Sequence, residues 1–318
     1  MSTSAHDVAK RLAAGMDTIL VGADRLTLGL TIALLARGHV LIEGVPGTGK
    51  TLAVRALAVL LGLNFRRIAF TPDVMPSDVV GTTIFNPQTA SFSTRSGPIF
   101  ANVVLADEVN RTPPKTQSAL LEAMEEGRVT IDGEPHPLPQ PFLLCATQNP
   151  IEYEGTYPLP EAQLDRFMIK IEATYPAERQ ELELLARAAG GFDARALEAS
   201  EIAPVTDAAE VLEAQESARL VHLSDSVRDY TYRIIAATRS HSRLTLGASP
   251  RAGIVLLAAA RTLAAIQGRD FATPDDVKDV ASFVIPHRLI VAPDAEIEGI
   301  SASEVLREVL AAVPVPRA

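Results

Sequence analysis

The chain has 318 residues, of which 47% are hydrophobic, and a formal net charge of −10 at pH 7. This length indicates two domains, or one domain with a lid, and enough apolar material for a sizeable core. The acidic balance argues against broad electrostatic capture of nucleic acid, although it is compatible with a local basic patch in a pore. The sequence shows no apolar run near the roughly 18 residues of a membrane span and no secretory signal pattern, so we expect a cytoplasmic protein.

Cysteine and histidine usage does not indicate a metal site. The one cysteine, Cys145, excludes an internal disulfide framework. It lies in an apolar strand pattern, which predicts a small core residue. The histidines without metal-ligand spacing are predicted to be surface or core residues, and they are His136, His222, His241 and His287.

Strands and helices alternate through the first half of the chain. The spacing of apolar residues predicts helices over 8–20 and 25–36, and Gly38 ends the second one. Strands are predicted at 39–43, 65–70, 103–108, 142–149 and 168–173, and those at 39–43 and 103–108 are apolar runs. Helices are predicted between them at 52–61 and 113–126. This alternation predicts an α/β domain with a parallel five-stranded sheet that ends near residue 176.

Two hairpins and a helical C-terminal half complete the predicted organisation. An Asn-Pro turn between β-prone runs predicts a hairpin at about 81–96, and an Asp-Gly turn predicts a second at about 128–141. Insertions of this kind tend to carry function. After a helical connector at 177–203, we expect an all-helical lid over 204–318. Its predicted helices are 207–218, 224–240, 249–267, 273–284 and 301–311.

A glycine-rich loop follows the first strand and leads into a helix. It matches the pattern GxxxxGK[ST] at every position, with Gly44, Val45, Pro46, Gly47, Thr48, Gly49, Lys50 and Thr51. Glycines let backbone N–H groups surround phosphate oxygens, and the helix N-terminus faces the same anion. Lys50 would reach the β and γ phosphates of a nucleotide, and the Thr51 hydroxyl would bind Mg²⁺. The alternative is a chance glycine turn.

Polar side chains end two of the later strands. Asp107 would order the Mg²⁺ shell, and Glu108 would act as general base for the water that attacks the γ phosphate. The alternative is a solvated acidic strand end. Asn149 ends the strand at 142–149, where it could hold that water or contact the γ phosphate. Its alternative role is to form a turn.

Two arginines are candidates for contacts with phosphate charge. Arg166 is suited to neutralising transition-state charge, in its own chain or in a neighbouring subunit. An ion pair with Asp165 or Glu161 is the alternative, and spacing alone does not decide. Ser249 predicts an N-cap that places Arg251 in the first turn of a helix. A cation opposes the helix dipole there, which points weakly to an anionic partner.

Together these motifs resemble the AAA+ ATPases and, more closely, the MoxR family. The similarity is dense over about 21–176, roughly half of the chain, and is thinner in the lid, where it lies mainly at 248–251. Besides the phosphate loop, the matching segments are 70–73, 76–78, 97–100, 105–111, 114–124, 146–150 and 154–167. The last of these is far more specific than a phosphate loop alone.

The resemblance implies a role for each candidate residue. Asp107 and Glu108 look like the Walker B pair, and Asn149 looks like sensor 1. Arg166 looks like the arginine finger that completes the site of the neighbouring subunit, and Arg251 looks like sensor 2.

Further positions follow from the same resemblance. Val21 and Gly22 fall where such proteins wall the adenine. The hairpin at 81–96 matches the helix-2 insert, and the one at 128–141 matches the hairpin before sensor 1. Arg111 is a rival for the finger role, because it follows the Walker B strand and carries a fixed charge.

Finally, the resemblance implies an assembly and an activity. Family members form rings, commonly hexamers, and are thought to remodel or activate client proteins or insert metal cofactors, often with a partner that carries a von Willebrand factor A domain. We therefore expect ATP and Mg²⁺ as cofactors in a homo-oligomeric ring. Two alternatives are a nucleic-acid motor, since helix-2-insert relatives include helicases, and a nucleotide-gated scaffold with little turnover.

Overall fold

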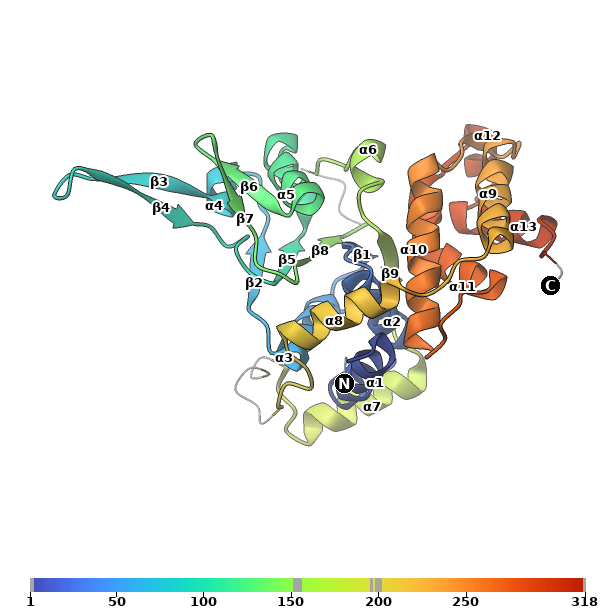
Figure 1. Cartoon of the computed structure of the whole chain (residues 1–318), viewed down its shortest axis with the longest axis horizontal. Helices are drawn as coiled ribbons and strands as arrows, with labels where there is room; N and C mark the ends of the chain where they lie inside the picture. The colour runs from blue at the N-terminus through green and yellow to red at the C-terminus, as the bar shows by residue number, and fades with distance from the viewer. Residues whose placement is uncertain (1–2, 151–155, 195–196, 198–201, 317–318) are drawn as a thin grey trace.

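The computed structural model describes residues 3–150, 156–194, 197 and 202–316. Residues 154 and 155 of the last family motif lie outside the described residues, as do 195–196 and 198–201 of the predicted connector. An α/β part and a largely helical C-terminal part stand side by side (Figure 1). Among the described residues, no helix is both long and apolar enough to cross a membrane.

A parallel sheet forms the centre of the α/β part, and its strands lie in the order β2-β5-β8-β1-β9. They are β1 (Val40–Gly44), β2 (Phe65–Ala69), β5 (Val103–Asp107), β8 (Leu143–Gln148) and β9 (Ile169–Ala173). The central strands β5 and β8 are buried along nearly their whole length, as expected for parallel strands covered on both faces. The predicted five-stranded parallel sheet is confirmed.

The register of the strands brings three polar strand ends together. Strand β8 lies between β5 and β1, because Ala106 pairs with Ala146 and Glu43 pairs with Gln148. The carboxyl ends of parallel strands meet at one edge of a sheet, where α/β proteins bind ligands. The phosphate loop after β1, the acids after β5 and Asn149 after β8 therefore share that edge.

Helices cover both faces of the sheet, and alternate residues of the strands pack into two separate apolar cores. Val103 and Leu105 belong to one core, and Val104 belongs to the other. Cys145 is buried in β8, and burial raises the pKa of its thiol above the ordinary value. The helices of this part are α1 (Ala5–Ile19), α2 (Asp24–Leu35), α3 (Lys50–Leu61), α5 (Pro114–Glu126), α6 (Glu161–Leu164) and α7 (Glu178–Ala189).

Two antiparallel hairpins project from the α/β part. The first follows the short helix α4 (Pro76–Val80) and consists of β3 (Gly81–Asn86) and β4 (Ser91–Ser96), which extend far from the body of the molecule (Figure 1). The second consists of β6 (Arg128–Ile131) and β7 (Glu134–Pro137). Nearly every residue of β3 and β4 is exposed.

The C-terminal part is helical, with two additions that the sequence did not predict, namely a short helix at 293–297 and a pair of short strands. Its helices are α8 (Ala208–Arg219), α9 (Asp225–Arg239), α10 (Pro250–Ile266), α11 (Pro274–Val284), α12 (Pro293–Ile297) and α13 (Ala302–Ala312). Strands β10 (Leu244–Leu246) and β11 (Ile290–Val291) form a short antiparallel pair. They are too short to show a strand periodicity, so an all-helical lid was expected there.

Helix α8 lies between the two parts of the molecule. It packs against α1 and α2 as well as against α10. One apolar core runs from β1 and α3 through α1 into α10 and α11, and it contains Leu12, Leu57, Val211 and Leu256. The division of the chain at residue 204 stays a prediction.

Candidate nucleotide site

A cavity of about 460 Å³ opens at the carboxyl edge of the sheet. The phosphate loop, the first turns of α3 and the ends of β5 and β8 line it. Its lining residues are Pro46, Gly47, Thr48, Gly49, Lys50, Thr51, Leu52, Arg55, Asp107, Glu108, Thr147, Gln148, Asn149 and Ala194. The sequence-predicted loop, acids and asparagine thus face one space, although they lie up to about 100 residues apart in the chain.

Two glycines of the loop have left-handed backbone conformations, with φ of 84° at Gly47 and 77° at Gly49. A Cβ at either position would meet nothing within 4 Å, so the backbone angle and not crowding requires glycine. Gly49 is also the N-cap residue of α3. The N–H groups of the first turn of α3 therefore remain available to an anion in the cavity.

Lys50 folds back onto the loop that carries it. Its Nζ donates hydrogen bonds to the carbonyl oxygens of Gly44 (2.5 Å) and Val45 (2.9 Å). Burial lowers the pKa of Lys50, while the charges of Asp107 and Glu108 oppose that shift. A phosphate in the cavity would offer Lys50 a full negative charge in place of two carbonyl dipoles.

Asp107 is held from both neighbouring strands. The hydroxyl of Thr147 on β8 donates to Asp107 Oδ1 at 2.6 Å, and Nε of Arg67 on β2 donates to Asp107 Oδ2 at 2.9 Å. Thr51, which carries a hydroxyl, and Asp107, which carries a carboxylate, line the same cavity. These are hard oxygen donors of the kind that Mg²⁺ prefers, so the residues present fit this ion.

Glu108 adopts a left-handed backbone conformation, with φ of 58°, directly before the 3₁₀ helix η1 (Val109–Arg111). Such conformations are costly for a residue with a side chain and are concentrated at functional sites. The N–H of Glu108 donates to the Thr147 hydroxyl at 2.9 Å. Its Oε2 lies 2.9 Å from Nε of Arg111. Arg111, the rival finger residue, therefore stands beside the acid of its own chain.

Arg166 and Arg251 are not among the residues that line this cavity. Both contact Oε1 of Glu125 near the end of α5, Arg166 through Nε at 3.0 Å and Arg251 through Nη1 at 3.1 Å. Their side chains are 31% and 47% exposed. Segments 85 residues apart thus place two guanidinium groups on one carboxylate at the surface.

Val21 and Gly22, the predicted adenine wall, also stand apart from the cavity lining. They lie in the turn between α1 and α2, and Gly22 has a φ of 66°. A Cβ on Gly22 would lie 2.3 Å from the side chain of Gln180 on α7. Because the tip of the flexible Gln180 side chain could move aside, the left-handed backbone angle is what favours a glycine at this position.

Sequence reasoning missed three residues of this site, namely Thr147, Arg55 and Arg67. Thr147 lies on β8, two positions before Asn149, which directly follows that strand, so the alternation of a strand was an available signal. Arg55 lies four positions after Thr51 on α3, which places both on one helix face. Arg67 gave no such signal, because only the pairing of β2 with β5 brings it to Asp107.

Comparison with known proteins shows which family the chain is similar to. Residues 39–169 match the model of the ATPase family associated with various cellular activities (AAA), and 236–309 match the AAA lid domain. The uncharacterized protein YeaC of Bacillus subtilis is 47% identical over 98% of this chain and 96% of its own length. The Chaperone MoxR1 of Mycobacterium tuberculosis is 44% identical over 94% of this chain and 80% of its own. A crystal structure of a protein assigned as an ATPase, from Cytophaga hutchinsonii, superposes with a TM-score of 0.89 at 40% identity and covers 98% of this chain and 96% of its own.

The fold and the site therefore define an ATPase of the AAA+ class, with an α/β core and a helical lid. Within that class, the chain belongs to the MoxR family.

Proposed function

We propose that this chain hydrolyses ATP with Mg²⁺ in a homo-oligomeric ring, commonly a hexamer in this family, and uses the resulting motion to remodel or activate client proteins. The observation that supports this most is that the charged residues implicated in hydrolysis lie in two separate places on the chain. Lys50, Asp107 and Glu108 share a cavity with Asn149, whereas the Arg166–Arg251 pair lies on another surface.

The residues of the cavity suit the separate tasks of hydrolysis. The loop N–H groups and Lys50 would bind the phosphates, and Asn149 would orient the attacking water. Glu108 would take the proton of that water. Thr51 and Asp107 would hold Mg²⁺, which would neutralise charge on the β and γ oxygens.

Arg166 and Arg251 would then serve the nucleotide of a neighbouring copy. In a ring, the interface is heterologous, so one surface of each copy faces a different surface of the next. A partly exposed arginine pair supplies the charge that a γ phosphate develops. The pairing of Arg111 with Glu108 of its own chain favours Arg166 for this task. We assign Arg251 to the nucleotide of a neighbouring copy and not to that of its own chain, because the residue does not line the nucleotide cavity of its own chain.

The work on client proteins rests on family membership. One relative is named a chaperone, and we propose a comparable activity here, including the activation of clients or insertion of metal cofactors. A protein with a von Willebrand factor A domain is the proposed partner.

Substitution of Glu108 tests the hydrolytic assignment. Glu108→Gln keeps the size of the side chain and one acceptor oxygen but removes the base. We expect ATP affinity within about threefold of the parent and a kcat lowered by roughly 10²–10⁴-fold. Equilibrium binding of a fluorescent ATP analogue and phosphate release measure the two quantities. Near-normal turnover would remove Glu108 as the base.

The charges of the hairpins do not favour a nucleic-acid motor. The β3–β4 hairpin carries one cation, Arg95, and Arg128 at the start of β6 lies 2.6 Å from Glu126. Proteins that bind DNA tightly neutralise several phosphates and lose affinity steeply with salt. Tight, strongly salt-dependent DNA binding in a filter assay would reverse this preference.

A further inference from the structure

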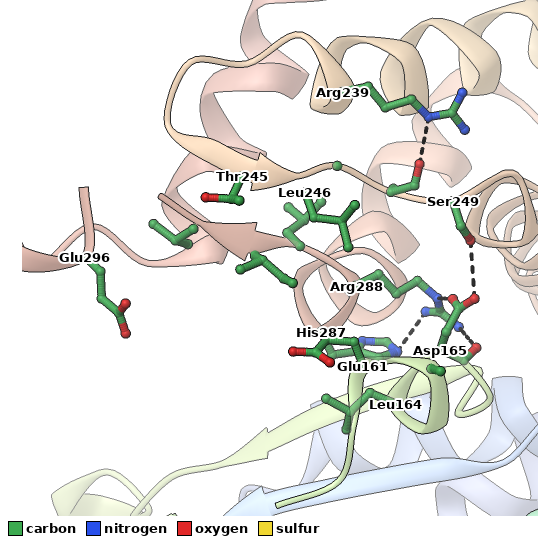
Figure 2. Close-up of a pocket in the computed structure, with 16 residues that line it drawn as sticks. Glu161, Leu164, Asp165, Arg239, Thr245, Leu246, Ser249, His287, Arg288 and Glu296 are labelled. Carbon is green, nitrogen blue, oxygen red and sulfur yellow. Dashed lines mark hydrogen bonds and ion pairs between the residues drawn. The ribbon is translucent and has the colours of Figure 1, made fainter. Parts of the chain in front are cut away.

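A buried arginine of the lid holds the segment that carries Arg166. The side chain of Arg288 is 1% exposed, and its Nε donates to Asp165 Oδ1 at 2.7 Å. Its Nη2 donates to the carbonyl oxygens of Asp165 (3.0 Å) and Phe167 (2.7 Å). Figure 2 shows this cluster at the edge of a cavity of about 770 Å³ between α6 and the lid. The lid thus contacts the backbone on both sides of Arg166.

The same carboxylate also reaches the start of α10. The Ser249 hydroxyl lies 3.3 Å from Asp165 Oδ2 (Figure 2). Ser249 is the N-cap of α10 and accepts a hydrogen bond from the N–H of Ala252. Arg251 follows in the first turn of that helix. Asp165 therefore connects the two segments that carry the arginines: it directly precedes Arg166 in the chain, and its carboxylate contacts the start of the helix that carries Arg251.

At their outer ends, these arginines meet again on Glu125. Arg288 and Asp165 fix the two side chains at their origins, and Glu125 holds them at their tips. An arginine that makes several hydrogen bonds at once fixes direction as well as distance, because its guanidinium is planar. Burial makes the Arg288 contacts hard to replace by water.

We propose that Arg288 and Asp165 are positioning residues that aim Arg166 and Arg251 together at the nucleotide of a neighbouring copy. A displacement of the lid would move Arg288, and Asp165 would transmit that movement to both arginines. This inference rests on the proposed function, in which the two arginines act on another copy.

A purely structural ion pair would have different consequences. Loss of a structural contact lowers the amount of folded protein, and with it the binding of ATP. Loss of a positioning contact leaves the phosphate loop of the same chain untouched and slows hydrolysis in the next copy. The lid offers a matched control in Arg269, which pairs with the buried carboxylate of Asp276 on α11, also within the lid.

Three variants separate these two roles. Arg288→Lys keeps the charge but loses the planar contacts, and Asp165→Asn keeps the shape but loses the charge. We expect each to lower kcat by roughly 10- to 100-fold, the scale of a misplacement of about 1 Å. The dissociation constant of a fluorescent ATP analogue should stay within about twofold of the parent value. Arg269→Lys should leave kcat per folded chain near the parent value.

Mixed assemblies show whether Arg288 acts on the nucleotide of its own chain or on the nucleotide of a neighbouring copy. Glu108→Gln chains lack the base but keep the arginines, so they should restore hydrolysis when mixed with Arg288→Lys chains. In a randomly mixed ring, about one quarter of all sites would then be complete. Arg288→Lys mixed with Arg166→Ala should show no gain in turnover over the separate proteins, because both lack the arginine contribution to the neighbouring site. Asp165→Asn should behave like Arg288→Lys, which provides a second variant if the first fails to fold.

The outcomes distinguish this inference from the proposed function. If Arg166→Ala and Glu108→Gln restore each other but Arg288→Lys and Asp165→Asn do not complement Glu108→Gln, the cluster is structural and the inference is wrong. Parent-like turnover of Arg288→Lys and Asp165→Asn, or restored hydrolysis when either is mixed with Arg166→Ala, would also overturn the inference. If a mixture of Arg166→Ala and Glu108→Gln chains shows no restored hydrolysis, the proposed function is wrong in assigning Arg166 to a neighbouring site.

Discussion

Thr147 connects the two acids of the site through one buried hydroxyl. That hydroxyl donates to Asp107 and accepts from the backbone N–H of Glu108. Strand β8 therefore sets the position of a carboxylate on β5 and the backbone of the residue that follows it. Because Glu108 is held in a left-handed conformation, this support is needed to keep its carboxylate directed at the cavity.

Removal of this hydroxyl should impair turnover more than binding. Thr147→Val keeps the shape but leaves the Glu108 N–H without this acceptor, at a cost of about 1–3 kcal/mol in stability. We expect kcat to fall by roughly 10- to 100-fold, with little change in ATP affinity. Thr147→Ser retains a hydroxyl and serves as the control in the same phosphate-release assay. Parent-like turnover of the valine variant would show that the hydroxyl is dispensable.

His39 is a buried neutral imidazole before β1. Its Nδ1 accepts from the N–H of Leu144 at 3.1 Å, and its Nε2 lies 3.1 Å from the carbonyl oxygen of Met124. Burial lowers its pKa to about 4. A proton on Nδ1 would oppose the Leu144 N–H, so the fold favours the neutral ring.

The depressed pKa of His39 predicts acid sensitivity. In the unfolded chain His39 binds a proton near pH 6.5. The stabilisation of the folded protein by neutral His39 is therefore complete above that pH and is lost as the pH falls toward 4. Between pH 7 and pH 4.5 we expect a loss of about 2 kcal/mol in the free energy of unfolding. Urea unfolding at both values, compared with His39→Gln, isolates this contribution. An equal pH dependence in both proteins would contradict the assignment.

At the scale of single residues, the sequence predicted which residues line the cavity better than it predicted which residues they contact. Lys50, Thr51 and Asp107 belong to short motifs whose spacing carries the chemistry. The contact of Arg166 with Glu125 was not predictable, since acids nearer in the chain, Asp165 and Glu161, were equally available. Only the tertiary structure, which brings Arg166 to the end of α5, selects Glu125.

Among the elements, the β3–β4 hairpin is the clearest case of a segment that contributes little to the fold. Phe92 is 74% exposed, and its ring contacts that of Phe85 at a centroid distance of 5.0 Å. The N–H of Thr83 donates to Asp132 of the second hairpin at 3.2 Å. Little apolar surface is therefore buried against the rest of the chain.

Shortening this hairpin should leave the nucleotide site intact. If a short turn replaces residues 83–94, we expect a melting temperature within about 2 °C of the parent and unchanged ATP affinity. Differential scanning calorimetry and analogue binding measure both. A fall of many degrees would show that the hairpin supports the core.

Long elements with strong patterns were predictable, and short ones were not. Strand β5 is a continuous apolar run up to its terminal acid, and helices such as α10 combine a Ser-Pro start with a long apolar face. Strands β10 and β11 contain three and two residues. Their pairing depends on the lid fold and not on local propensity.

On the scale of the whole molecule, the lid and the α/β part share one apolar core. Lid and α/β part are therefore mechanically connected, both through this core and through Arg288 and Asp165. Sequence patterns place the longer helices but do not say which distant helix each of them packs against. For this reason the role of α8 between α1 and α10 could not be foreseen.

The central claim is that each hydrolytic site requires a second copy of the chain. It is tested most directly by measuring phosphate release per chain, at saturating ATP, across the protein concentrations over which analytical ultracentrifugation shows assembly. We predict that the rate per chain rises with assembly and reaches a plateau when assembly is complete, because Arg166 then completes each neighbouring site. A rate per chain that is constant from monomer to assembled protein would contradict the claim.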